Sequence, residues 1–307
     1  MRPRVKQLSI YKIYADMGKL KDLLELIRIP NIFTAQADIF TGFFVAHGGL
    51  KDTGNLICLI IASSMLYSAG MALNDAFDSE TDFQERRYRP IPSGRVSIRE
   101  AFITGIALLL LGIFFASLVS PSSFTIAMIL AVSILSYDGV VKVHRLFGPM
   151  NMGGCRYLNL LLGLSVSALS LTSFILPLLT GIFIFGVTVL SQWETRDERS
   201  VIPVCLCLGS IGCVFILYGL CHQLDLLPQK IGLLLCFLWL IFSSLCLFRL
   251  LKRDSNTDIQ ETVKALILSL VLLDGIIVAG SGPIFWTFLI WSLLFPTLFL
   301  SRKFYVT

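Results

Sequence analysis

Charged residues are scarce in this sequence. Only 15% of its 307 residues are charged and 55% are hydrophobic, whereas a soluble domain usually carries about 25% charged residues. The composition therefore argues against a water-soluble globule. Its richness in apolar residues, which include 23 phenylalanines, also excludes a disordered chain. The net charge of +5 is too small and too scattered to predict a nucleic-acid-binding surface.

The sequence also has few of the residues that build thiolate or imidazole metal sites. Its 3 histidines stand apart, and its 8 cysteines form no Cys-x-x-Cys pair and lie mostly inside apolar runs. A cysteine in such a run usually serves as a small packing residue. We therefore expect neither a metal–thiolate site nor a disulfide framework. The first residues hold no short apolar segment followed by a cleavage site, so we expect no signal peptide.

Long apolar runs cover most of the chain. Each approaches the roughly 20 residues that a membrane-spanning helix needs. The runs lie at residues 30–47, 56–75, 99–120, 122–141, 153–171, 174–192, 201–220, 231–250, 263–280 and 283–301. The runs are not alternating like barrel strands, so they predict an all-α, polytopic transmembrane bundle of nine to ten spans. We place this transmembrane domain at residues 30–301.

The basic residues gather in every second loop between these runs. If each run crosses the membrane, 23 of the 25 lysines and arginines fall on one side, and Lys51 and Lys230 fall on the other. The positive-inside rule then places both termini on the cytoplasmic or equivalent side, which requires an even number of spans. Residues 1–29 have the pattern of an amphipathic segment on the membrane surface, and 302–307 form a short tail. A bacterial cytoplasmic membrane and a plastid membrane both remain open.

An acidic cluster follows the second apolar run. The segment 74–82 reads Asn-Asp-Ala-Phe-Asp-Ser-Glu-Thr-Asp. Steps of three and four residues join Asp75, Asp78 and Asp82, so their carboxylates are expected on one helical face. Like charges at a membrane boundary need a cationic partner, and hard oxygen ligands of this kind suit Mg2+. Solvated acids at a helix end are the simpler alternative.

A basic, turn-rich loop comes directly after these acids. It contains Arg86, Arg87, Arg89 and Arg95 among prolines and a glycine. Acids that hold a metal beside arginines that hold anions describe a site for a diphosphate. Ser97 and Glu100 have the spacing of a capping box that starts the next helix. The prolines and the glycine before Ser97 are typical of turns. We therefore expect an ordered lid in this loop.

The combined pattern resembles the first signature of the UbiA superfamily of intramembrane prenyltransferases. The matching positions are Asn74, Asp75, Asp78, Asp82, Arg89, Pro90, Pro92, Ser93, Gly94 and Arg95. The entry to the first run, 28–31, and Tyr137-Asp138 with Lys142 are also similar to the family. The resemblance implies a helical barrel around a central lipid-open cavity, in which Mg2+ bridges the aspartates to a prenyl diphosphate. It also implies binding roles for Asn74 and for the cations near the fourth run.

The second signature of that superfamily is altered in this chain. The superfamily has Asp-x-x-x-Asp after the sixth span, and the corresponding positions here are Glu194 and Glu198. Their i,i+4 spacing places both on one helical face, so they are candidates for the second half of the metal site. Ordinary charges of a cytoplasmic loop explain the same residues, with Arg196 and Arg199 as competing partners.

Further polar residues are candidates for substrate binding. Lys142 and Arg145 end the fourth run where they can face a diphosphate, and Arg156 starts the next run; the positive-inside pattern explains these charges as well. Asn31 and Asp38 share a stripe that points into the bundle, which suits acceptor binding. Asp274 lies inside the ninth run, where we expect a helix–helix hydrogen bond.

The sequence thus predicts a Mg2+-dependent prenyltransferase. The expected metal ligands are Asp75, Asp78 and Asp82, with Glu194 and Glu198. The expected catalytic residues are Asp75, Asp78, Asp82 and Lys142. The expected substrate-binding residues are Asn31, Asp38, Asn74, Arg86, Arg145 and Arg156. The segment 142–159 and the Phe-Tyr-Val-Thr end resemble EboC-like members, which implies a role with secondary metabolites. The acceptor, whether aromatic ring, sugar alcohol or phosphate ester, stays open. The alternative is a non-catalytic UbiA-scaffold protein that binds or helps to transport a lipid or metabolite.

Overall fold

We analysed the protein as a computed structural model, which describes residues 18–193, 201–252 and 256–301. Those residues form helices and the turns between them, beginning with a short helix at 18–26. The helices that follow are α2 (Ile29–His47), α3 (Thr53–Phe77), α4 (Ser79–Glu85), α5 (Ile98–Ser117), α6 (Pro121–Ser136), the π-helix η1 (Tyr137–Val141), α7 (Phe147–Leu164), α8 (Leu171–Ile175), α9 (Pro177–Ser191), α10 (Ile202–Gln223), α11 (Lys230–Lys252), α12 (Asn256–Ser281), α13 (Phe285–Ser292) and α14 (Leu294–Leu300).

The predicted all-α class is confirmed, because each apolar run of the sequence is mostly helical in the part that the structure describes; the run at 153–171 is interrupted at 165–170. Seven helical segments are long and apolar enough to cross a membrane. The central helices α2 and α7 are not among those seven, and α13 with α14 forms a shorter apolar stretch, Phe285–Leu300. The molecule is therefore an integral membrane protein, while a total of nine to ten spans remains a prediction.

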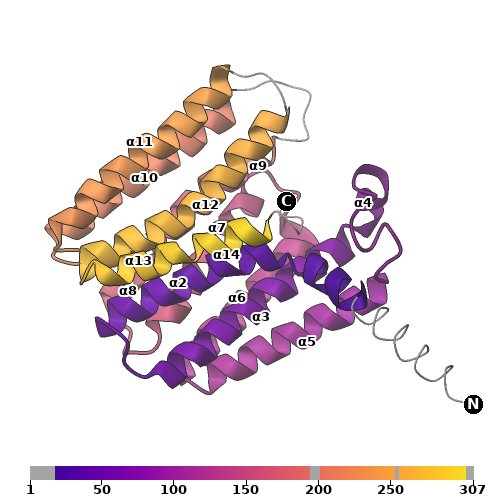
Figure 1. Cartoon of the computed structure of the whole chain (residues 1–307), viewed down its shortest axis with the longest axis horizontal. Helices are drawn as coiled ribbons and strands as arrows, with labels where there is room; N and C mark the ends of the chain where they lie inside the picture. Colours follow the sequence, from indigo (N-terminus) through magenta and orange to yellow (C-terminus); the bar gives the residue numbers. More distant parts are fainter. Residues whose placement is uncertain (1–17, 194–200, 253–255, 302–307) are drawn as a thin grey trace, which may run out of the picture.

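The helices lie roughly side by side in one bundle (Figure 1). The pair α10 and α11 forms one flank, and α3 with α5 forms the other. Between the flanks, α2 packs against α3, α7 and α12. The main hydrophobic core runs through this central group and is built largely of leucine, isoleucine and valine side chains. The arrangement places polar side chains of α2, α3 and α7 where they can meet inside the bundle.

Two glycines allow α2 and α7 to approach each other closely. A Cβ atom at Gly42 would lie 2.5 Å from the backbone nitrogen of Leu164, and one at Gly163 would lie 2.7 Å from the carbonyl oxygen of Ile39. Real Cβ atoms do not come so near to backbone atoms, so only glycine fits at this crossing. The close contact brings Asp38 of α2 beside the polar residues of α7.

Replacing Gly163 by alanine is expected to destabilise the protein, because the methyl group would push α2 away from α7. Overpacking of this kind costs about 1–3 kcal/mol, which should appear as a lower melting temperature in detergent. Gly154 on the same helix is the matched control, since a Cβ there meets nothing within 4 Å. Equal melting temperatures for Gly163→Ala and Gly154→Ala would contradict the close crossing.

A second, small hydrophobic cluster anchors the loop at residues 86–97. Its buried members come from four segments: Leu26, Ala72, Ala76, Ile91, Val96 and Ala101. The predicted capping box is confirmed, because the Ser97 side chain accepts from the Glu100 backbone and the Glu100 carboxylate accepts from the Ser97 backbone. Arg95 donates to Asp22 and Glu25 of the short helix at 18–26. These hydrogen bonds, those that Glu25 accepts foremost, raise the pKa of the Arg95 guanidinium. The predicted ordered loop is thus held at both ends.

Candidate functional site

The acidic segment lies where α3 passes into α4. Helix α3 ends at Phe77, but backbone hydrogen bonds still join Asp78 N to Asn74 O and Asp82 N to Asp78 O. The i,i+4 spacing that the sequence predicts is therefore retained across the helix boundary. In Figure 1, α4 projects from the end of the bundle, so the acids sit at the margin of the apolar region.

Asp75 and Asp82 face the same arginine. Nη1 of Arg89 donates to Oδ1 of Asp75 at 3.2 Å and to Oδ2 of Asp82 at 2.6 Å. The side chains of all three residues are at most 4% exposed. A second arginine, Arg28, donates from Nη2 to Oδ1 of Asp75 at 2.9 Å. Charge-assisted hydrogen bonds of this kind are stronger than neutral ones, and they tie the loop at 86–97 to the end of α3.

Asp78 has a different partner. Its carboxylate forms an ion pair with Lys142, which follows η1, and both side chains are partly exposed, at 28% and 19%. One turn before Lys142, Asp138 is buried, and its Oδ2 has no hydrogen-bond partner among the described residues. Single-turn π-helices such as η1 occur frequently at functional sites. Lys142 therefore reaches the acidic segment, while its expected role toward a diphosphate stays a prediction.

A second polar cluster lies deeper in the bundle, between α2 and α7. Nη1 of Arg156 donates to Oδ2 of Asp38 at 3.1 Å, and Nη2 donates to Thr34 Oγ1 at 2.9 Å. Asn159 Nδ2 donates to the same Asp38 oxygen at 2.8 Å. The Arg156 guanidinium also lies 5.5 Å from the centroid of the Tyr67 ring, within the range of a cation–π contact. The predicted candidates Asp38 and Arg156 therefore bind each other.

The remaining candidates are more dispersed. Asn31 is buried near the start of α2, Asn74 is half-buried on α3, and Arg145 is exposed in the turns before α7. Nη1 of Arg86 lies 3.9 Å from Oδ1 of Asp82. Glu194 and Glu198 lie outside the described residues. Within residues 18–193, 201–252 and 256–301, no three acids, histidines or cysteines come close enough together to hold a metal ion.

Three residues of the site were missing from the predicted set or lacked a role there. Arg28 reaches Asp75 from the turn before α2, with a left-handed backbone (φ 50°) that is uncommon outside glycine. Arg89 bridges two aspartates, and Asp138 is buried near Asp78. All three belong to segments that resemble the superfamily. A one-dimensional pattern, however, does not show which cation reaches which carboxylate.

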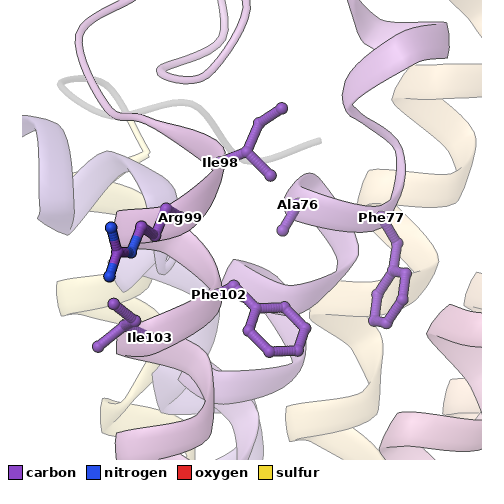
Figure 2. A pocket seen from close by; sticks show the side chains of 6 residues that line it. All are labelled: Ala76, Phe77, Ile98, Arg99, Phe102 and Ile103. Atoms are coloured by element: carbon purple, nitrogen blue, oxygen red, sulfur yellow. The ribbon is translucent and has the colours of Figure 1, made fainter.

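A hollow of about 760 Å³ lies at the outer side of this region. Figure 2 shows its lining: Ala76 and Phe77 at the end of α3, and Ile98, Arg99, Phe102 and Ile103 on α5. Ala76 and Phe102 come from the two helices toward each other, while Arg99 and Ile103 point to the other side of α5. The hollow is lateral and largely apolar, so the central cavity that the resemblance implies remains an expectation.

The described part of the site has a definite chemistry. Carboxylates and guanidinium or ammonium groups alternate at one end of an apolar helical bundle, and the oxygen ligands are those that a hard divalent cation prefers. A membrane-embedded helical protein with buried and half-buried carboxylate–cation pairs at one end of its bundle is the class that fold and site define together.

Comparison with known families agrees with this class. The model of the UbiA prenyltransferase family matches residues 38–201, which is more than half of the chain. The chain therefore belongs to the UbiA prenyltransferase family. The matched region contains Asp38, the acidic segment of α3 and α4, Lys142 and Arg156.

Curated relatives are similar to this chain in sequence over part of their length. A digeranylgeranylglyceryl phosphate synthase of Saccharolobus solfataricus is 27% identical over 144 residues, which are 47% of this chain and 51% of that protein. The corresponding enzyme of Methanothrix thermoacetophila is 32% identical over 154 residues, 50% of this chain and 58% of the relative. The alignments thus span about half the length of these curated relatives.

Solved structures share the fold over most of the chain. A structure of digeranylgeranylglyceryl phosphate synthase superposes with a TM-score of 0.68 at 22% identity, covering 86% of this chain and 98% of the other. A UbiA homologue from Archaeoglobus fulgidus bound to GPP and Mg2+ also gives 0.68, at 13% identity, covering 88% and 99%. At these identities the likeness establishes a common fold.

Proposed function

We propose that this protein is a Mg2+-dependent prenyltransferase that acts on a prenyl diphosphate inside the membrane. The observation that carries the proposal is the pairing of Asp75 with Arg28 and of Asp78 with Lys142 at one end of a UbiA-fold bundle. The site provides both the carboxylates that a divalent cation needs and the cations that a diphosphate needs. The A. fulgidus homologue was solved with GPP and Mg2+, which supports this choice of donor and metal.

The chemistry of the oxygen donors supports magnesium as the metal, and the described residues alone do not assemble a complete set of ligands. Oδ1 of Asp75 and Oδ1 of Asp78 already bind cationic side chains, and the orphaned Oδ2 of Asp138 is a further buried oxygen in the same region. We propose Asp75 and Asp78 as metal ligands, with Asp82 held in place by Arg89 and available only if that pair opens. Glu194 and Glu198 are the proposed second half of the site. Bound Mg2+ would neutralise the diphosphate and stabilise charge that develops on it.

Side chains of the protein carry out the rest of the proposed chemistry. Lys142, once released by Asp78, would bind the leaving diphosphate together with Arg86 and Arg145, where positive charge stabilises the transition state most. Asn74 would orient the carboxylates from the preceding turn of α3. The apolar helices keep water away from the allylic cation and offer the prenyl tail an apolar environment.

The acceptor belongs to the same proposal. The name of the curated relatives states a product, digeranylgeranylglyceryl phosphate, so we propose a glyceryl phosphate ether as acceptor of the prenyl group. Asn31, Asp38 and Arg156 are the proposed residues on the acceptor side. The expected EboC-like subfamily is not confirmed, because these relatives are named digeranylgeranylglyceryl phosphate synthases; a secondary metabolite as acceptor rests on the resemblance of 142–159 alone. The orientation with both termini on the cytoplasmic side remains a proposal that rests on the 23 basic residues of one side.

The reaction itself is the test. Purified protein in lipid is expected to release diphosphate from geranylgeranyl diphosphate when Mg2+ and a glyceryl phosphate ether are present. Removal of the metal with EDTA should abolish the release, and added Mg2+ should restore it. The prenylated product, identified by mass spectrometry, would name the acceptor among the candidates offered. Binding of the prenyl diphosphate without any turnover would instead support a non-catalytic carrier, the alternative that the altered second motif favours.

A further inference from the structure

Two aspartates from opposite ends of the sequence meet inside the bundle. Asp38 on α2 and Asp274 on α12 are both fully buried, and their helices pack against each other. The two carboxyl groups lie within hydrogen-bonding distance of each other. Asp274 lies beyond the region that matches the family model, residues 38–201.

The hydrogen-bond donors around these two carboxyl groups reach only one of the four carboxyl oxygens. Oδ2 of Asp38 accepts from both Arg156 and Asn159, at 3.1 and 2.8 Å. Oδ1 of Asp38 and both oxygens of Asp274 receive no hydrogen bond from the described residues. Three buried acceptor atoms thus lack a donor, although buried polar atoms almost always have a partner.

The balance of charge around Asp38 and Asp274 also indicates that a positive partner is missing. If both carboxyls were ionised, Arg156 would balance one charge and leave the other inside an apolar bundle, where an unpaired charge is costly. Two ionised carboxylates also have no hydrogen to share. A metal cation would need about six oxygen ligands, whereas the contacting carboxyls offer three oxygens without donors. A shared proton needs only two oxygen atoms, one that carries it and one that accepts the hydrogen bond.

We propose that Asp38 and Asp274 share one proton, with the hydroxyl of Asp274 donating to Oδ1 of Asp38. The proton gives Oδ1 of Asp38 a donor and gives one of the two Asp274 oxygens a partner, and the pair then carries a single negative charge that balances Arg156. Asp274 thereby acts as a positioning residue: it holds Asp38, which with Thr34 fixes the Arg156 guanidinium under Tyr67. The proposal concerns the folded protein and does not depend on the proposed reaction.

Infrared spectroscopy of the purified full-length protein in lipid tests the shared proton directly. The wild type is expected to show the C=O stretch of a protonated carboxyl that shifts in D2O. Asp274→Asn should remove this band, and Asp38→Asn, which replaces the carboxylate that accepts from the Asp274 hydroxyl, should change its frequency. Asp225→Asn, on an exposed loop residue, is the control and should retain it. Absence of the band from the wild type would overturn the proposal, and a melting temperature that rises with added Na+ would then identify a metal cation in its place.

Thermal stability separates the two partners. Asp274→Asn keeps a donor for Asp38 Oδ1, so the melting temperature should remain close to that of the wild type. Asp38→Asn removes the charged partner of Arg156, and a broken buried pair is expected to lower the melting temperature by roughly 6–10 °C. Asp274→Leu offers no donor to Asp38, so its melting temperature should lie between those of Asp274→Asn and Asp38→Asn. An Asp274→Asn variant as unstable as Asp38→Asn would mean that Asp274 is ionised, and the proposal would be wrong.

Discussion

Replacing Asp78 by asparagine is expected to reduce prenyl transfer by roughly 100-fold or more, because an amide is a poor ligand for a divalent cation and charge stabilisation dominates such reactions. The ion pair of Asp78 with Lys142 is partly exposed, so its loss should cost at most about 1 kcal/mol of folding free energy. We expect diphosphate release to fall while the melting temperature changes little. Measured binding of Mn2+ should weaken in parallel.

Glu80 provides the matched control for this prediction. It is an exposed acid on α4, two residues from Asp78, and Glu80→Gln removes the same formal charge. We expect this variant to retain activity and Mn2+ binding. If Glu80→Gln impaired both as much as Asp78→Asn does, the general negative charge of the segment would be responsible, and Asp78 would not be a specific ligand.

The helices of this protein could be predicted because lipid imposes a simple rule on sequence. A run near 20 apolar residues has to be helical to satisfy its backbone, and the described helices coincide with the predicted runs. The span count was harder to predict. Helices α2 and α7 line the polar interior, so their composition is less apolar than that of the outer helices α10 and α11.

The candidate site was predicted in part. Local spacing placed Asp75, Asp78 and Asp82 together, and it also predicted the capping box at Ser97. The partners of these acids come from distant positions: Arg28 from before α2 and Lys142 from after η1. Such contacts depend on how helices pack, and Gly42 and Gly163 set that packing without any charge or motif of their own. The partners of Asp38 were likewise not evident from the spacing, because its Oδ2 accepts from Arg156 and Asn159 of α7.

Replacing Arg89 by glutamine is expected to have the largest effect on stability. Its Nη1 bridges Asp75 and Asp82, and all three side chains are at most 4% exposed. Removing one partner of a buried ion pair leaves an uncompensated charge and costs about 3–5 kcal/mol. The melting temperature in detergent should therefore fall by roughly 10 °C, and the loop at 86–97 should become accessible to protease.

A double-mutant cycle shows whether the bridge itself is responsible. Asp82→Asn removes one of the two stranded charges, so the Arg89→Gln/Asp82→Asn variant should lose less stability than the sum of the single changes, by about 1–3 kcal/mol. Arg87→Gln is the control, because the Arg87 side chain is exposed and donates to the carbonyl oxygen of Phe83. Additive effects in the cycle would mean that Arg89 stabilises the loop by packing alone. Coupling of the expected sign would mean that Asp82 serves to hold the loop at 86–97, which leaves Asp75 of α3 and Asp78, between α3 and α4, as the proposed metal ligands of this segment.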